Sequence, residues 1–293
     1  MTPADVVDHL SGKDQSHSGL SLIDIGVNLT SSQFAQDRDD VVARARQHGI
    51  VAQLVTGTNL ASSKEALAYV KNQPDLFSTC GFHPHHASEF TPDALNQLKE
   101  LAAHPKVRAI GETGLDFNRN FSPRHQQEFA FNEQLQLAAA LKKPLFLHQR
   151  DAHDTFIALL KNQHSRLQNI SMVVHCFTDT LSALRDCLDL GCHIGITGWI
   201  CDKKRGEALR QIVQYIPDDR LLIETDAPYL LPHNLEEVMS LKPTVKKRNE
   251  PACLYAVLVQ VAQCRSQSVG QVAAITYENA LDFMQLKQHT SMA

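Results

Sequence analysis

Several features that would assign the chain to common protein classes are missing. Among its 293 residues, no apolar stretch approaches the roughly 18 that a membrane-spanning helix needs. The first twenty residues lack the regions of a signal peptide, so we expect a soluble, cytoplasmic protein. The seven cysteines are widely spread and include no Cys-x-x-Cys pair, which excludes a disulfide framework or a zinc finger.

Strong charge and several catalytic signatures are absent as well. The chain has no Gly-x-Ser-x-Gly elbow, no Walker loop and no kinase signature. The formal net charge is only −4, so no overall positive field attracts a polyanion. This argues against a protein that coats nucleic acid, but it allows an enzyme that holds a nucleic-acid end through local contacts.

What the sequence does contain is a regular series of short apolar runs, 43 % of its residues being hydrophobic. Eight of these runs are candidate strands: 21–25, 50–56, 76–81, 107–111, 144–148, 172–176, 192–197 and 221–225. Amphipathic stretches lie between them, which predicts a single (β/α)₈ TIM barrel over 21–287, with a polar extension at 1–20 and a tail at 288–293. A doubly wound open sheet is the main rival, but the turn after the first run, DIGVNLTSS, lacks the expected glycines.

Two helix starts and one long loop can also be recognised. Thr91-Pro92 and Ser122-Pro123 each offer a capping hydroxyl followed by proline at the first helical position. The segment 123–142 is the longest helix candidate. The connection 227–249 is too long and irregular for an ordinary barrel loop, and such loops are usually functional or disordered.

Four of the apolar runs end on residues that bind metals or move protons. These residues are Glu112, His148, His175, and the pair Glu224 and Asp226. Barrel enzymes place their chemistry where the parallel strands end, so these side chains are expected in one pocket. Two imidazoles with one or two carboxylates suit Zn²⁺, Mn²⁺ or Mg²⁺.

A histidine-rich run, GFHPHHAS, follows the third candidate strand. His83 is nearest to the strand and could contact a phosphate or donate a proton to a leaving group, whereas His85 and His86 are weaker candidates. The alternative is a surface turn with solvated histidines. Cys176 follows His175 directly and would point to the opposite face of a strand, which argues against a Cys-His nucleophile.

Two basic clusters follow candidate strands on the same rim, and they are Lys203-Lys204-Arg205 and Lys246-Lys247-Arg248. Charge runs are usually solvated faces. On this rim, however, they would also suit an anionic substrate such as a nucleic acid.

Eight segments carry a family resemblance: DIGVNLTSSQF, GFHPHHAS, AIGETGLDFNRNFS, FLHQRDAH, VVHCFTD, GITGWICD, LLIETDAPYLLP and RNEPACL. Together they resemble the TatD family of metal-dependent deoxyribonucleases, a branch of the amidohydrolase-like barrels, from about Leu22 to Phe283. The resemblance implies a Mg²⁺-dependent 3′→5′ exonuclease that prefers single-stranded DNA and leaves RNA open as a substrate.

The resemblance also implies roles for the residues at the strand ends. Glu112, His148 and His175 would be metal ligands. Asp226 would complete the metal site or orient the attacking water, and Glu224 would support it.

Further residues match positions of the family site. His83 corresponds to a histidine implicated there and would stabilise or protonate the departing oxygen. Arg248 and Asn249 belong to the matching segment RNEPACL, and Arg248 is expected near a phosphate. Asn28 is the third expected substrate contact.

One departure concerns the first strand. Many relatives carry a His-x-His pair that holds a second, buried metal, and here those positions are Gly26 and Asn28. Asn28 offers only a neutral oxygen and Gly26 offers no ligand. A one-metal site is therefore expected, with a second ion recruited by substrate phosphate as the alternative.

Two other functions use the same barrel. One is an amidohydrolase-type enzyme for a small amide, lactone or phosphotriester, because fold alone does not separate these chemistries. The other is a catalytically inactive barrel that acts as a binding partner. A monomer is the default expectation for the oligomeric state.

Overall fold

The computed structural model describes residues 19–287. Nearly all of the expected N-terminal extension, 1–20, and all of the expected tail, 288–293, lie outside the described residues. Within them, eight strands alternate with helices, as the (β/α)₈ prediction requires.

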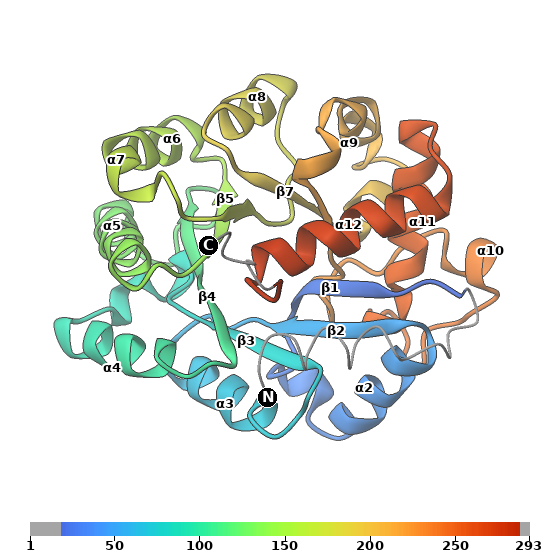
Figure 1. Cartoon of the computed structure of the whole chain (residues 1–293), viewed down its shortest axis with the longest axis horizontal. Helices are drawn as coiled ribbons and strands as arrows, with labels where there is room; N and C mark the ends of the chain where they lie inside the picture. The colour runs from blue at the N-terminus through green and yellow to red at the C-terminus, as the bar shows by residue number, and fades with distance from the viewer. Residues whose placement is uncertain (1–18, 288–293) are drawn as a thin grey trace, which may run out of the picture.

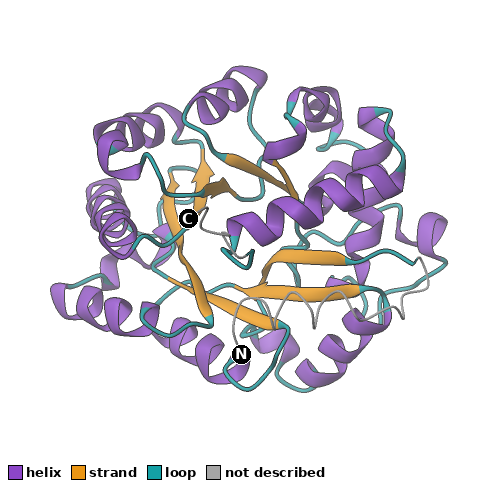
Figure 2. Cartoon of the chain, in the orientation of Figure 1, coloured by secondary structure: helices purple, strands orange, loops and turns teal. Residues whose placement is uncertain are grey.

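The strands form one parallel sheet in the order of the chain, from β1 to β8. Helices surround it on the outside (Figures 1 and 2), which confirms the barrel. The strands are β1 (Leu22–Val27), β2 (Ile50–Val55), β3 (Leu76–Cys80), β4 (Val107–Asp116), β5 (Leu145–Arg150), β6 (Met172–Val174), β7 (His193–Ile196) and β8 (Leu221–Ile223).

The outer layer consists of α-helices and short 3₁₀ segments. The α-helices are α2 (Arg38–Gln47), α3 (Leu60–Val70), α4 (Pro92–Ala102), α5 (Arg124–Leu141), α6 (His153–Asn162), α7 (His164–Leu167), α8 (Leu181–Asp189), α9 (Glu207–Ile212), α10 (Leu235–Met239), α11 (Leu254–Arg265) and α12 (Val269–Phe283). The 3₁₀ segments are η1 (Ser32–Phe34), η2 (Pro84–Glu89), η3 (Gly198–Cys201), η4 (Val213–Tyr215), η5 (Asp218–Arg220) and η6 (Pro251–Cys253).

One of the two predicted helix caps is confirmed and the other is wrong. The Thr91 hydroxyl accepts a hydrogen bond from the backbone N–H of Ala94 at the start of α4. Helix α5 begins at Arg124 after Pro123 and has no side-chain cap. The Ser122 hydroxyl instead fixes the loop before the helix, as described below.

β4 is longer than its apolar run, because it continues through the glycine-rich segment GETGLD to Asp116. Gly111 and Gly114 both have a φ of 146°, in the region that favours glycine. A Cβ atom would lie 2.3 Å from the carbonyl oxygen of Phe146 at the first position and 1.9 Å from that of His148 at the second. Only glycine therefore allows β4 to run this close to β5, and Glu112 lies within the strand.

β8 and β1 meet at a seam that a buried carboxylate holds together. Val27 and Ala227 form an isolated bridge across it. Asp24 accepts hydrogen bonds from the backbone N–H groups of Thr225, at 2.9 Å, and Gly26, at 3.2 Å. Because Thr225 directly precedes Asp226, the seam also fixes the position of a predicted site residue.

The last residue of α12 and the residues just after it close the base of the barrel. Phe283, Met284 and Leu286 are fully buried in an apolar cluster inside the N-terminal end of the sheet. Six of its strand members are the second residue of their strand: Ile23, Val51, Phe77, Phe146, Val173 and Leu222. Helix α12 brings the three side chains there while packing on β8 and β1 (Figure 1).

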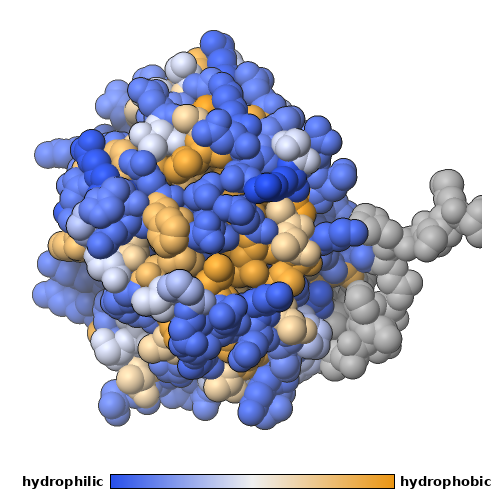
Figure 3. Space-filling model, turned by 90° about the vertical axis from the view of Figure 1, so that its left-hand side faces the viewer, coloured by the Kyte–Doolittle hydropathy of each residue, from blue (hydrophilic) through white to orange (hydrophobic). Residues whose placement is uncertain are grey.

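The surface over α4 and α5 is mostly polar, with apolar residues gathered across its middle (Figure 3). Phe129 of α5 is 55 % exposed. None of the described helices is both long enough and apolar enough to span a bilayer.

We predict that Phe283→Ala lowers the free energy of unfolding by about 3–5 kcal/mol, because it leaves a cavity in the base of the barrel. Phe129→Ala is the matched control, and it should cost less than about 1 kcal/mol since its ring is exposed. Urea denaturation followed by circular dichroism measures both values. Equal losses in the two variants would contradict the packing role of Phe283.

Candidate metal centre

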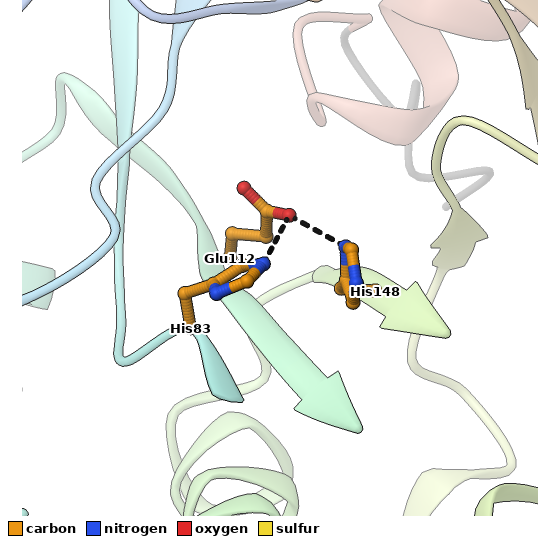
Figure 4. A group of neighbouring side chains, drawn as sticks. All are labelled: His83, Glu112 and His148. Carbon is orange, nitrogen blue, oxygen red and sulfur yellow. Dashed lines mark hydrogen bonds and ion pairs between the residues drawn. The ribbon is translucent and has the colours of Figure 1, made fainter. Parts of the chain in front are cut away.

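Side chains from two neighbouring strands and from two loops that follow strands meet around a single carboxylate oxygen. Oε1 of Glu112, on β4, lies 3.0 Å from Nδ1 of His148, on β5, and 2.9 Å from Nε2 of His175, which follows β6. Nε2 of His83, in the loop after β3, lies 3.3 Å from the same oxygen. Figure 4 shows the Glu112 carboxylate between the rings of His83 and His148. All four residues are buried or nearly so.

Two of the three imidazoles have a carboxylate behind their other ring nitrogen. Nε2 of His148 faces Oδ2 of Asp116 at 3.6 Å, and Nδ1 of His175 faces Oε1 of Glu224 at 3.4 Å. A carboxylate in this position holds a proton on that nitrogen and leaves the opposite nitrogen free to bind a metal. The free nitrogens are then Nδ1 of His148 and Nε2 of His175, the two nearest to Glu112.

His83 differs from the other two imidazoles. Its Nδ1 accepts a hydrogen bond from the backbone N–H of His85 at 3.1 Å. A neutral imidazole that accepts at one nitrogen carries its proton on the other, so Nε2 of His83 points an N–H toward Glu112. In this arrangement His83 is a hydrogen-bond donor, and Nε2 is not available as a metal ligand.

Burial and mutual charge set the protonation of the cluster. Burial alone would raise the pKa of Glu112, but the imidazoles of His175, His83 and His148 hold it well below its usual range. Burial lowers the pKa of His83 to about 4, so this ring is neutral at pH 7. Burial opposes protonation of His148 and His175 too, but carboxylates raise the pKa of both above the usual value.

The donor set fits a divalent metal ion. His83, Glu112 and His148 offer atoms that all lie within 4.8 Å of one another. Nε2 of His175 lies 2.9 Å from Oε1 of Glu112 and 3.4 Å from Nδ1 of His148. One carboxylate with two imidazoles, each backed by a further carboxylate, matches the chemistry of catalytic metal centres. An ion here would lie between Oε1 of Glu112, Nδ1 of His148 and Nε2 of His175.

Asp226 lies beside this group and is tied to the first strand. Its Oδ1 accepts a hydrogen bond of 2.9 Å from Nδ2 of Asn28. Burial raises the pKa of Asp226 to about 7, with the positive charge of His175 opposing the shift. The structure thus brings Asn28 to the site as the partner of Asp226.

Glu224 occupies the space that the first-strand glycine leaves open. A Cβ atom on Gly26 would lie 2.2 Å from Oε2 of Glu224, and one on Gly195 would lie 2.6 Å from Oε1. Oε1 also accepts a hydrogen bond of 2.6 Å from the backbone N–H of Cys176. A side chain at position 26 therefore requires the Glu224 carboxylate to move.

Cys176 takes no part as a nucleophile. Burial raises the pKa of its thiol to about 12, and the nearby charge of Asp226 adds to the rise. The thiol thus stays protonated at neutral pH. β6 ends at Val174, so the strand alternation that we used to place Cys176 does not extend to it.

The sequence reasoning missed Asp116. Oδ2 of this residue lies 2.7 Å from Nε2 of His85 as well as close to His148. The sequence does contain a sign of this residue, because Glu112, Gly114 and Asp116 are two residues apart from one another. On one strand, such residues point to the same face. Ending the predicted strand at residue 111 concealed this alternation.

Arg248 and Asn249 do not face the metal centre. The Arg248 side chain is 5 % exposed, and its guanidinium donates to Oδ2 of Asp37 at 2.6 Å and to Oε1 of Glu250 at 2.8 Å. Nδ2 of Asn249 donates to the carbonyl oxygen of Thr225 at 3.0 Å. Both side chains hold the long loop against the barrel, and the expected contact of Arg248 with a phosphate has no geometric support.

The basic cluster after β7 lies at the surface. Lys203, Lys204 and Arg205 are exposed. Arg205 pairs with Asp202 at 2.8 Å and covers one face of the Trp199 ring, with 4.4 Å between guanidinium carbon and ring centroid. The two lysines are therefore the freer charges of this cluster.

A sequence profile described as TatD related DNase matches residues 23–285. The chain belongs to this family. A protein from Erwinia tasmaniensis named 3′-5′ ssDNA/RNA exonuclease TatD is 51 % identical over 260 residues, which is 88 % of this chain and 98 % of that protein. The protein of the same name from Salmonella typhimurium is 49 % identical over 259 residues, 88 % of this chain and 97 % of the other.

Solved structures of TatD proteins share the fold. A TatD family hydrolase from Entamoeba histolytica superposes with a TM-score of 0.81 at 26 % identity, covering 90 % of this chain and 98 % of the other. A TatD homologue from Escherichia coli gives a TM-score of 0.79 at 27 % identity, covering 89 % and 97 %. A dihydroorotase from Campylobacter jejuni shares the barrel fold alone. It superposes with a TM-score of 0.53 at 15 % identity, covering 92 % of this chain and 84 % of the other.

Binding of a divalent ion should expel protons from the TatD centre. Since the pKa values of His148 and His175 are raised, both rings hold an extra proton up to a higher pH than a free imidazole does, and a metal ligand must be neutral. The affinity for the ion should therefore rise as the pH rises above the usual pKa of an imidazole. Calorimetric titration with Mn²⁺ in two buffers of different ionisation enthalpy counts the protons, and a count of zero at pH 7 would contradict this protonation.

We predict that Arg248→Ala lowers the free energy of unfolding by about 1–3 kcal/mol, because Asp37 and Glu250 lose one of their two cations and keep only Arg44. Lys204→Ala is the control and should change stability by less than about 0.5 kcal/mol. Urea denaturation measures both. A fully stable Arg248→Ala protein that binds single-stranded DNA less well would instead favour the phosphate contact.

Proposed function

We propose that the chain is a metal-dependent 3′→5′ exonuclease that hydrolyses phosphodiester bonds in single-stranded DNA and also accepts RNA. The observation that supports this proposal is the convergence of Glu112, His148 and His175. Each of the two histidines also has a carboxylate near its second ring nitrogen. The names of relatives that are about half identical over nearly their whole length give the substrate class.

The ion would be held by Oε1 of Glu112, Nδ1 of His148 and Nε2 of His175. Such an ion lowers the pKa of a bound water and polarises a phosphoryl oxygen. Asp116 and Glu224 keep the two ligand rings in the required orientation. We propose Mg²⁺ as the ion, with Mn²⁺ or Zn²⁺ as substitutes that the same ligands accept.

Asp226 is the proposed general base. Its pKa of about 7 lets it take a proton from the attacking water near neutral pH. Asn28 donates to Oδ1 and so leaves Oδ2 to face the water. Asn28 thus acts on the carboxylate of Asp226 rather than as a direct ligand.

His83 is the proposed donor to the departing oxygen. Its ring is neutral and its proton lies on Nε2, because the backbone N–H of His85 occupies Nδ1. The Nε2–H can stabilise the charge that develops on the leaving oxygen of the 3′-terminal nucleotide. Lys203 and Lys204 would attract the strand from the rim.

A one-metal site follows from the first strand. Gly26 supplies no ligand, and the Glu224 carboxylate fills the space beside it. A second ion would have to be brought by the substrate phosphate. We further propose that the enzyme acts as a monomer in the cytoplasm, and light scattering checks the first point.

We predict that wild-type protein with Mg²⁺ shortens a 5′-labelled single-stranded oligonucleotide to a ladder from the 3′ end, and that chelator abolishes the ladder. Glu112→Ala and His148→Ala should each reduce the rate by more than about 100-fold through loss of the ion. Glu100→Ala and His125→Ala, exposed on α4 and α5, are the matched controls and should cut at the wild-type rate.

Three other results would contradict the proposed function or its metal centre. Full activity of Glu112→Ala would exclude the proposed centre. A wild type that binds metal but hydrolyses dipeptides or lactones and no oligonucleotide would indicate an amidohydrolase-type enzyme. A wild type that binds no metal and cleaves neither class would indicate a barrel that serves only for binding.

A further inference from the structure

Two aromatic side chains stand exposed beside the metal centre. Phe121, in the loop between β4 and α5, is 67 % exposed, and Tyr229, in the loop after β8, is 52 % exposed. A single exposed apolar side chain is common and needs no explanation. These two differ from Phe129 and Tyr215, which are also exposed, because they lie on the loops that surround the catalytic cluster.

The Phe121 ring continues the row of rings that leads to Glu112. Its centroid lies 4.7 Å from that of His85 in an edge-to-face contact. The His85 ring lies 4.2 Å from that of His83, and His83 reaches Glu112. The ring of Phe121 is thus two side chains away from the atoms that hold the metal.

The loop that presents Phe121 is fixed from both sides. The Ser122 hydroxyl donates to the carbonyl oxygen of His85 at 3.0 Å and accepts from the backbone N–H of Ser88 at 3.0 Å. Nε2 of Gln127 donates to the carbonyl oxygen of Ser122 at 2.8 Å. An exposed ring on a rigid support loses little entropy when a ligand covers it.

Tyr229 is fixed in a similar way. Its backbone N–H donates to the carbonyl oxygen of Asp226 at 3.0 Å, and the N–H of Asn249 donates to that of Pro228 at 3.1 Å. The loop that Arg248 and Asn249 hold against the barrel is therefore the loop that carries this ring.

Both loops follow strands at the same rim of the barrel as the metal centre. The loop after β4 reaches the centre through the ring contact of Phe121 with His85, and the loop after β8 reaches it through the backbone hydrogen bond of Tyr229 to Asp226. Trp199 is a weaker candidate for contact with a ligand, because Arg205 already covers one face of its ring.

We propose that Phe121 and Tyr229 form a stacking platform for the unpaired bases at the 3′ end of the strand. This inference rests on the proposed nuclease function and adds the subsite that would select single strands. Aromatic rings stack on every base, so the platform tolerates any sequence. A base inside a duplex already has neighbours on both faces and cannot reach the rings.

Binding in the presence of chelator tests the platform without catalysis. The probe is a single-stranded oligonucleotide with 2-aminopurine at its 3′ end, followed by anisotropy and by fluorescence quenching. Phe121→Ala and Tyr229→Ala should each weaken binding by roughly 5- to 150-fold and reduce the quenching. Phe129→Ala and Tyr215→Ala should bind and quench as the wild type does.

Conservative variants separate stacking from other roles of the two side chains. Phe121→Trp and Tyr229→Phe keep a ring and should retain affinity and quenching. Phe121→Leu keeps apolar bulk without a ring and should fail as Phe121→Ala does. Wild-type affinity in Phe121→Leu would overturn the stacking role.

An oligonucleotide whose 3′-terminal nucleotides lack bases provides the decisive comparison. Wild type should bind and cut it less well than the intact strand, whereas the double variant Phe121→Ala/Tyr229→Ala should treat the two alike. If both proteins cut DNA and both prefer the intact strand to the same degree, the stacking platform is overturned and the proposed nuclease function stands. A wild type that neither binds nor cuts the intact strand would overturn the nuclease proposal and the platform together.

Discussion

A buried carboxylate surrounded by imidazoles is the constraint on which this site depends. An isolated charge in the interior of a protein is very costly, so Glu112 is stable there only while positive or hydrogen-bonding partners surround it. Those partners come from neighbouring strands, and the close approach of β4 to β5 permitted by Gly111 and Gly114 brings them together. A bound ion would satisfy the same requirement, because it too places positive charge beside the carboxylate.

Most of the fold could be predicted from the sequence, because buried parallel strands are short apolar runs and seven of the eight end within two residues of the prediction. The exception is β4, where GETGLD is too rich in glycine and polar residues to look like a strand. The orientation of the His83 ring depends on one backbone N–H from His85, and no residue pattern reveals such a contact. The ion pairs of Arg248 were equally hidden, since its partner Asp37 is more than two hundred residues away.

The change in the first strand is best understood together with the eighth. Gly26 and Gly195 both lie against the Glu224 carboxylate, which in turn faces His175. The absence of a ligand at position 26 and the placement of a supporting carboxylate at 224 are therefore coupled through space, because a side chain at position 26 would require the Glu224 carboxylate to move.

The closure of the barrel by its last helix has a consequence for biosynthesis. Phe283, Met284 and Leu286 fill the base of a sheet whose first strand begins at Leu22, so the interior is incomplete until the chain has been made as far as Leu286. Domains fold as units during translation, and this unit requires its final segment. A ribosome that stalls before α12 would thus release a chain with an open, apolar base, which is a target for chaperones and proteases and not a partly active nuclease.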